Sequence, residues 1–205
     1  MTKLAIISGG LREPSSTRLL ANRLEGAVRG ELEGLGHSVG TSFVELRPLG
    51  HAVMDAMLSG FPSAPLEEAF ETVAGADGVI AVTPAFNASF SGLFKSFFDV
   101  LPEATLADMP VLIAATGGTE RHSLVLEHAL RPMFSYLHAI VSPRGVYAAT
   151  SDFGSEEARP GGALQDRVKA ASADYARLVQ GCGSRRRRDP FTADLVSMDQ
   201  LLGDS

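Results

Sequence analysis

The 205-residue sequence has few of the features that mark secreted or membrane proteins. It contains one cysteine, Cys182, which excludes an internal disulfide and fits a reducing compartment. No apolar run approaches the roughly 18 to 20 residues that a membrane-spanning helix needs, and no basic start precedes a long apolar stretch. We therefore expect a cytoplasmic protein that does not enter a membrane.

Basic residues are also scarce. Lys and Arg number 18 against 24 Asp and Glu, so the net charge is -6. Proteins that bind nucleic acid usually cluster basic residues against the phosphate backbone, and we expect no nucleic-acid partner here. The exception is the arginine run at 185–188, which follows the last helical pattern beside Gly181 and Gly183. We interpret this run as part of a solvated or interface-forming tail over residues 182–205.

Several catalytic and metal-binding motifs are missing. The five histidines show neither the H-E-x-x-H spacing nor cysteine partners, so we expect no metal site. A G-x-S-x-G nucleophile motif does not occur, and Cys182 lies far from the candidate loops described below. Neither the G-x-G-x-x-G nor the G-x-x-x-x-G-K-[ST] nucleotide fingerprint is present.

The patterns that are present predict a single α/β domain. With 45% hydrophobic residues, the chain is long enough for one continuous core. Strand-like apolar runs lie at 4–7, 43–46, 79–82, 111–115 and 139–141, the last continued by 146–149. Helical patterns lie between and after them, at 19–35, 66–74, 90–101, 124–137 and 163–179. This alternation predicts a doubly wound, five-stranded parallel sheet with helices on both faces.

Three loops carry the candidate chemistry. In doubly wound sheets, ligands bind beyond the carboxyl ends of the strands, which singles out the loops at 8–17, 83–92 and 116–123. All three are rich in Gly, Ser, Thr, Pro or Asn, which supply hydrogen-bonding groups and unusual backbone angles.

The first loop favours a phosphate monoester. Ser15, Ser16 and Thr17 stand where a helix begins, and helix N-termini present free N–H groups to anions. Ser8 and Arg12 could close the site from the other side. The loop has no lysine, which a nucleoside triphosphate usually requires. The alternative is that Ser15 or Ser16 is only a helix N-cap.

The second and third loops favour a planar heteroaromatic ring. Pro84 gives a rigid wall, Phe86 an aromatic face and Asn87 an amide, although Phe86 could instead be a core or interface residue. The glycines at 117–118 allow close backbone approach to a ligand, or form only a tight turn. His122 could contact a ligand, cap a helix or lie at a subunit interface.

The helix after the second loop predicts association between subunits. It carries more apolar surface than one face against a sheet requires, from Leu93, Phe94, Phe97, Phe98 and Leu101. We therefore expect part of that surface to meet another copy of the chain, in a homodimer or a homotetramer.

These three loops resemble the signature segments of the NADPH-dependent FMN reductase family, which has a flavodoxin-like fold. The matching segments are SGGLREPSSTRLLANRL, TPAFNASFSGLFKSFFDVL and ATGGTERHSLVLEHALRPM. The resemblance covers about residues 2–180, which makes 1–181 the expected flavodoxin-like domain. It is strongest to the branch that supplies reduced flavin to luciferase-like two-component monooxygenases.

The resemblance implies FMN contacts in all three loops. The phosphate contacts would be Ser8, Arg12, Ser15, Ser16 and Thr17; the ribityl chain and isoalloxazine would meet Pro84, Ala85, Phe86 and Asn87; and Thr116, Gly117 and Gly118 would reach the pyrimidine edge. Many relatives have Tyr and Glu where this chain has Phe86 and Ala85, which removes two polar groups. Lys95 and the aromatic helix around it resemble the dimer interface of the family.

The implied activity is hydride transfer from NADPH or NADH to the flavin, with reduced FMN passed to a flavin-dependent monooxygenase. No side-chain acid or base is required for that transfer, so we name no catalytic residue. Two alternatives stay open: a reductase that retains FMN and reduces a quinone, azo dye or metal ion, and a non-catalytic flavodoxin-like electron carrier.

Overall fold

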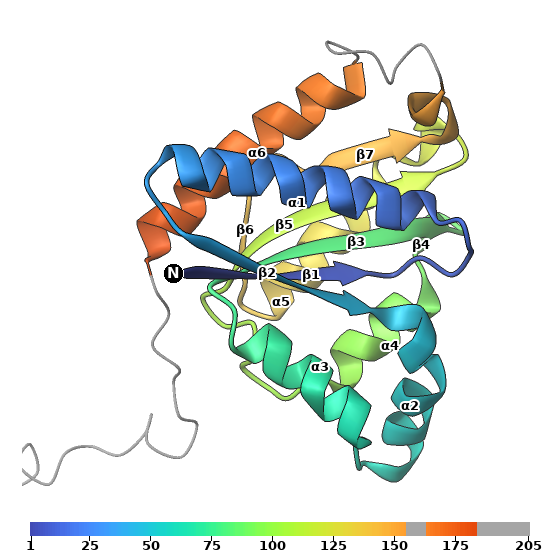
Figure 1. Cartoon of the computed structure of the whole chain (residues 1–205). Coiled ribbons are helices and arrows are strands. Elements are labelled where there is room, and N and C mark those ends of the chain that lie inside the picture. Colours follow the sequence, from blue (N-terminus) through green and yellow to red (C-terminus); the bar gives the residue numbers. More distant parts are fainter. Residues whose placement is uncertain (155–162, 184–205) are drawn as a thin grey trace, which may run out of the picture.

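Near-continuous apolar segments of the chain form the middle of a parallel sheet in the computed structural model, which describes residues 1–154 and 163–183. The strands are β1 (Thr2–Ser8), β2 (Val39–Glu45), β3 (Gly78–Phe86), β4 (Ser89–Phe90), β5 (Pro110–Gly117), β6 (Ile140–Val141) and β7 (Val146–Ala149). The order across the sheet is β2-β1-β3-β5-β6, and β7 also pairs with β5 (Figure 1). This order is that of flavodoxin-like folds, and it confirms the predicted fold class.

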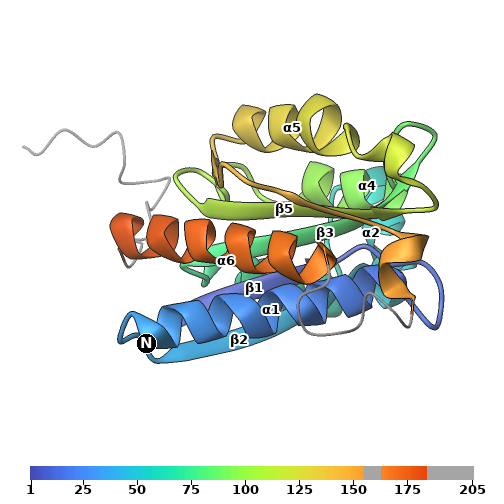
Figure 2. The ribbon, with the colours of Figure 1, turned by 90° about the horizontal axis from the view of Figure 1, so that it is seen from above.

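Helices cover both faces of the sheet. The face with α1 (Ser16–Gly34) and α6 (Ala163–Cys182) is seen in Figure 2, where the two helices lie side by side. The other face carries α2 (Leu46–Ser59), α3 (Ala64–Ala74), α4 (Gly92–Val100) and α5 (Arg131–Tyr136). Three single turns, η1 (Glu120–His122), η2 (Leu126–Leu130) and η3 (Thr150–Phe153), complete the described elements. Among the described helices, none is long and apolar enough to cross a membrane.

Each face of the sheet has its own apolar core. Leu20, Leu24, Val28 and Leu32 recur at helical spacing along α1 and are fully buried against β1 and β3. On the other face, α4 places Phe94 at the centre of a cluster that includes aromatic residues of α3 and α5. Because both faces are covered, β1, β3 and β5 are fixed in position, and so are the loops that leave their carboxyl ends.

Three boundaries differ from the sequence-based expectation. The second strand ends at Glu45, and Leu46 begins α2, a helix that the sequence patterns did not predict. Phe90 belongs to the short strand β4, and the following helix starts at Gly92 behind its N-cap Ser91. The helix expected over 124–137 opens with the π-helical turn η2 before α5 begins at Arg131. The arginine run at 185–188 lies outside the described residues.

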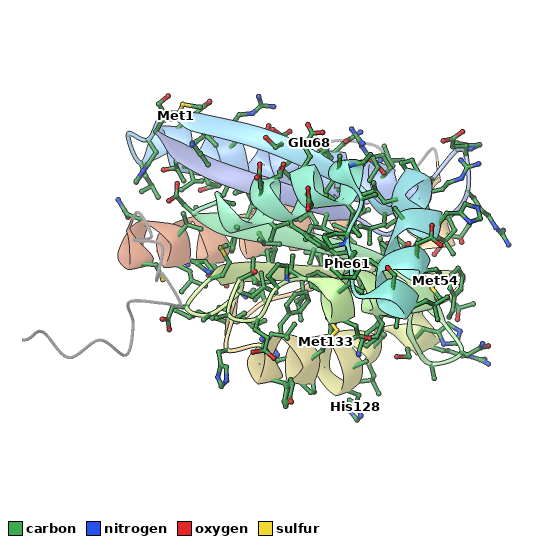
Figure 3. The ribbon with its side chains drawn as sticks, turned by 90° about the horizontal axis from the view of Figure 1, so that it is seen from below. Met1, Met54, Phe61, Glu68, His128 and Met133 are labelled. Atoms are coloured by element: carbon green, nitrogen blue, oxygen red, sulfur yellow. The ribbon has the colours of Figure 1, made fainter. Side chains whose placement is uncertain are left out.

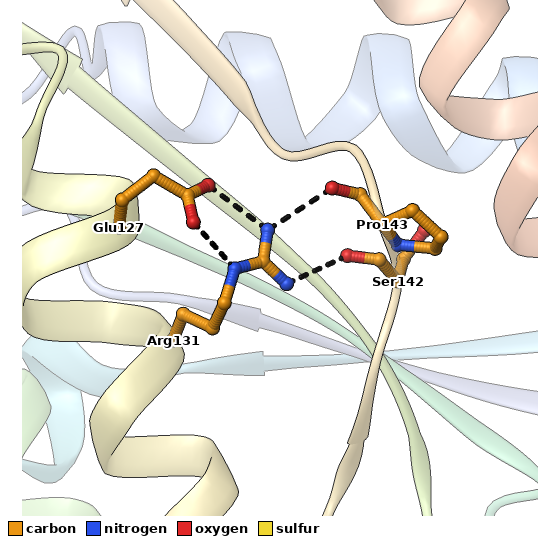
Figure 4. Close-up of polar contacts among 4 residues, drawn as sticks. All are labelled: Glu127, Arg131, Ser142 and Pro143. Atoms are coloured by element: carbon orange, nitrogen blue, oxygen red, sulfur yellow. Dashed lines mark hydrogen bonds and ion pairs between the residues drawn. The ribbon is translucent and has the colours of Figure 1, made fainter.

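The fifth strand position is shared by β6 and β7, as the sequence patterns indicated. Pro110 of β5 pairs with Ile140 and Ala114 pairs with Val146, so the edge chain has two more residues than β5 between these pairs. The side chain of Arg131 points to Ser142 and Pro143, which lie between β6 and β7 (Figure 4). It donates to the carbonyl oxygens of Ser142 and Pro143 at 3.0 and 3.1 Å, and to the carboxylate of Glu127 at 2.6 and 2.9 Å. These bonds join Arg131 at the start of α5 to the segment between β6 and β7.

Candidate functional site

The three predicted loops leave one edge of the sheet. Because β1, β3 and β5 are parallel neighbours, their carboxyl ends lie together. The Gly9 N–H donates to the Val82 carbonyl oxygen at 2.8 Å, which joins the first loop to β3. Pro84 at the start of the second loop lies opposite Thr116 at the end of β5. The structure therefore brings the predicted site residues to one place.

The first loop ends in a capped helix with free backbone donors. Ser15 is the N-cap of α1, and its Oγ accepts the backbone N–H of Arg18 at 3.1 Å. The backbone N–H groups of Ser16 and Thr17, the first two residues of α1, have no acceptor among the described residues. The Ser8 Oγ is buried with no hydrogen-bond partner in the described structure. Orphan donors at a helix N-terminus and an unpartnered buried hydroxyl both suit an anion.

Close packing in this loop requires glycine at position 10. A Cβ at Gly10 would overlap with the Ser15 Oγ, so the turn folds directly onto the helix cap. Glu13, the acidic residue of the loop, is paired with Arg47 of α2 at 2.7 Å. Arg12 is exposed and has no ion-pair partner among the residues that the structure describes. Arg12 is therefore available to an anionic ligand.

Thr17 and Thr116 join the first loop to the third. Their hydroxyl oxygens lie 2.9 Å apart, and both residues are buried. The Thr17 hydroxyl is therefore engaged within the protein, which leaves its backbone N–H as the group with no partner in the described chain.

The second loop is a tight β-hairpin and not an open loop. Asn87 and Ala88 have φ of 48° and 64°, and they connect β3 to β4, where Phe86 pairs with Ser89. Two central residues with positive φ are typical of a type I′ turn. Phe86 is 42% exposed at this tip, so it is not a core residue. It presents an aromatic surface at the edge of the site.

The aromatic helix does not supply the surplus surface that the sequence patterns indicated. Phe94, Phe97 and Phe98 of α4 are buried within the chain, and Leu93 packs against the same cluster. The rings of Phe94 and Phe98 pack edge-on with centroids 4.9 Å apart. The three rings share one apolar cluster with Phe70 of α3 and Phe134 of α5. Their apolar area is thus used inside one chain.

The third loop is held by a residue that the sequence analysis missed. Tyr147 of β7 donates its hydroxyl to the Thr119 carbonyl oxygen at 2.7 Å. A Cβ at Gly117 would overlap with that hydroxyl, whereas Gly118 faces open space. His122 is exposed in η1. The signal for Tyr147 is weak in the sequence: a tyrosine near the end of the apolar run VYAA.

The described residues contain no group of three or more His, Cys, Asp or Glu side chains placed to hold a metal ion.

Comparison with known proteins identifies the family. Residues 2–154 match the NADPH-dependent FMN reductase family. The chain is 40% identical over 151 residues to the NADH-dependent FMN reductase SfnF of Pseudomonas fluorescens, covering 74% of this chain and 78% of that protein. It is 35% identical to an FMN reductase (NADPH) of Pseudomonas aeruginosa, covering 87% and 93%.

A solved structure agrees with this assignment. An oxidoreductase from Corynebacterium diphtheriae superposes with a TM-score of 0.83 at 43% identity, over 88% of this chain and 98% of the other. The matched region contains all three loops at the carboxyl edge of the sheet. This chain belongs to the NADPH-dependent FMN reductase family.

Proposed function

We propose that this chain is an NAD(P)H-dependent FMN reductase that binds FMN across the three loops at the carboxyl edge of the sheet. The observation that carries the proposal is the pair of free N–H groups of Ser16 and Thr17 at the start of α1, in the loop that opens with the unpartnered buried hydroxyl of Ser8. A phosphate monoester would satisfy the free N–H groups at the start of α1, and the exposed Arg12 of the same loop supplies a positive charge. The residues present therefore fit the phosphate end of FMN.

The remaining predicted contacts suit the ring end of FMN. Phe86 offers an exposed aromatic surface beside Pro84, Ala85 and Asn87 on the hairpin. Gly117 and Gly118, next to Thr116, have no side chains that would keep a ligand away from their backbone N–H and carbonyl groups. When bound, the flavin accepts a hydride from NADPH or NADH, and the protein supplies binding and orientation. No side-chain acid or base is assigned to the transfer.

The test is a kinetic titration. We expect the purified protein to oxidise NADPH or NADH only when FMN is added, with a rate that saturates in FMN. Riboflavin, which lacks the phosphate, is the matched ligand control, and it should bind at least about tenfold more weakly, because it loses charge-assisted hydrogen bonds of about 1.5 to 3 kcal/mol each. Absence of both FMN binding and FMN-dependent oxidation would exclude the proposed function.

We further propose that reduced FMN leaves the protein and supplies a flavin-dependent monooxygenase, within the cytoplasm. The exposure of Phe86 supports exchange of the ring with solvent, and the single, free Cys182 supports a reducing compartment. Kinetics in which FMN behaves as a saturable second substrate are expected. Ping-pong kinetics with retained flavin and an added quinone would instead favour the quinone or azo reductase alternative.

We also infer that copies of this chain associate through the outer face of α2. Met54, Met57 and Leu58 follow the i, i+3, i+4 spacing of one helix face, and Phe61 follows the C-cap residue Gly60. Leu58 is 86% exposed and Phe61 is 80% exposed. Met54 and Phe61 are labelled in Figure 3, which views the molecule from below relative to Figure 1. A second copy offers the same stripe, so a two-fold axis beside α2 would cover both.

A further inference from the structure

Tyr147 connects the edge strand β7 to the third loop. It pairs with Ala115 across the parallel β5–β7 ladder, and its ring is buried. Its hydroxyl donates to the Thr119 carbonyl oxygen at 2.7 Å. The loop residue Thr119 is itself exposed, so the bond fixes a solvent-facing segment to the core of the sheet.

The same ring shapes the backbone at Gly117. A side chain there would overlap with the Tyr147 hydroxyl and would come within 3.1 Å of its ring carbon Cζ. The Cβ of Ala85 lies 3.6 Å from the same position. The Cβ position of Gly117 is thus close both to the ring of Tyr147 and to the second loop. A change in the position of Tyr147 would therefore be transmitted to both loops.

Tyr147 remains a hydrogen-bond donor at neutral pH. Burial raises the pKa of its hydroxyl above the ordinary value of 10.0, and the nearby carboxylate of Asp152 raises it further. The proton is therefore retained, and the Thr119 carbonyl oxygen keeps its partner.

We propose that Tyr147 is a positioning residue for the flavin ring. It acts through Thr119 and Gly117 and holds the backbone of the third loop where it can contact the edge of the ring. The inference rests on the proposed function, since it assumes that this loop meets the flavin. Tyr147 itself is not assigned contact with flavin or with the nicotinamide.

Tyr147→Phe tests the hydroxyl while keeping the ring. We expect the KM for FMN to rise about fivefold, the size of effect that a lost neutral hydrogen bond gives. At saturating FMN, kcat should change less than about twofold, because the hydride transfer does not use Tyr147. The visible absorption band of bound FMN should shift relative to wild type, since the ring edge meets a less ordered loop.

Tyr175→Phe is the matched control. Tyr175 is the other tyrosine of the described chain that is buried and hydrogen-bonded to backbone: its hydroxyl donates to the Val79 and Pro110 carbonyl oxygens at 3.0 and 3.2 Å. Val79 and Pro110 lie at the amino ends of β3 and β5, whereas the loops of the site leave the carboxyl ends. We expect Tyr175→Phe to lower the unfolding midpoint but to leave the KM for FMN and the flavin spectrum unchanged.

A double-mutant cycle tests the link to Gly117. Gly117→Ala should weaken FMN binding by more than about tenfold, because the new methyl group overlaps with the Tyr147 hydroxyl. In Gly117→Ala combined with Tyr147→Phe, part of that overlap is removed, so the two losses should be less than additive. Additive losses would overturn the proposed link.

Three further results would overturn the proposal. An unchanged KM and spectrum in Tyr147→Phe would show that the hydroxyl does not position the ring. Equal KM changes in Tyr147→Phe and Tyr175→Phe would show a general stability effect, and an unfolded Tyr147→Phe would make Tyr147 a folding residue. Failure of the proposed function is distinguishable, because wild type itself would then bind no FMN.

Discussion

At the scale of single residues, Ser16 is the position where an added charge tests the phosphate site most directly. It is the first residue of α1, it is exposed, and its N–H has no acceptor among the described residues. Ser16→Glu would place a carboxylate beside the FMN phosphate. We expect FMN affinity to fall at least tenfold, since the phosphate would lose the side-chain hydroxyl of Ser16 as a donor, worth about 1.5 to 3 kcal/mol, and would meet a like charge. Fluorescence titration measures the change.

The control for Ser16→Glu is Ala64→Glu. Ala64 is the first residue of α3 and is also exposed, but it belongs to none of the three loops. Both variants place an acid at a helix N-terminus, which by itself favours the helix slightly. Ala64→Glu should therefore leave FMN affinity unchanged. Equal affinities for Ser16→Glu and wild type would mean that the phosphate binds elsewhere.

The sequence predicted the local features of the site better than its long-range contacts. The Ser15 cap follows from a serine placed just before an apolar helical pattern, and the structure has Ser15 in that position. The Thr17–Thr116 contact joins residues 99 positions apart, and the Tyr147–Thr119 bond joins residues 28 apart. No periodicity encodes such pairs, because only the order of strands in the sheet brings them together.

At the scale of elements, the bulge in the edge strand depends on Arg131. Its guanidinium satisfies the Ser142 and Pro143 carbonyl oxygens as well as Glu127. Arg131→Ala should reduce the free energy of unfolding by about 2 kcal/mol, because hydrogen bonds to a charged group are each worth about 1.5 to 3 kcal/mol and these are partly exposed to solvent. Chemical denaturation measures the loss.

Lys95→Ala is the control for Arg131→Ala. Lys95 forms the same i, i+4 type of ion pair, with Asp99, but the described structure gives its ammonium no carbonyl partner. Surface pairs of this kind contribute about 0.5 kcal/mol or less, so Lys95→Ala should be nearly neutral. A similarly small loss in Arg131→Ala would contradict the role of Arg131 in holding the edge strand.

The contacts of Arg131 also predict that the stability of the protein depends on pH. The hydrogen bond from Arg131 lowers the pKa of Glu127 below its ordinary value of 4.5. A lowered folded-state pKa stabilises the protein above the unfolded value, and the contribution is lost as pH falls through the folded one. The gap in stability between wild type and Glu127→Gln should therefore narrow below about pH 4.5. A difference in stability between the two proteins that stays constant down to pH 3 would contradict this prediction.

The elements that the sequence failed to predict have identifiable causes. In α2, Pro48 and Gly50 interrupt the first turns, and Leu46, Val53 and Ala56 are its buried residues. So few core positions give no clear helical period. By contrast, β1, β3 and β5 are apolar almost throughout because both faces are covered, and all three lie where the sequence placed them.

At the scale of the whole molecule, exposed apolar surface lies on α2, whereas the sequence patterns placed it on α4. The aromatic side chains of α4 are buried in one chain, whereas Leu58 and Phe61 at the end of α2 are almost fully exposed. Monomeric proteins rarely expose contiguous apolar patches larger than a few hundred Å². The α2 stripe, with Met54 and Met57, is therefore the surface of the described chain where we expect a second copy to bind.

Leu58→Glu should convert the oligomer to a monomer, because a two-fold interface would bring two such carboxylates together in an apolar contact. Light scattering should give at least a dimer for wild type and a monomer for this variant. The matched control is Leu124→Glu: Leu124 is also exposed, but it lies between η1 and η2 beyond the carboxyl end of β5. A monomeric wild type would exclude the interface, and an unchanged mass for Leu58→Glu would place it on another face.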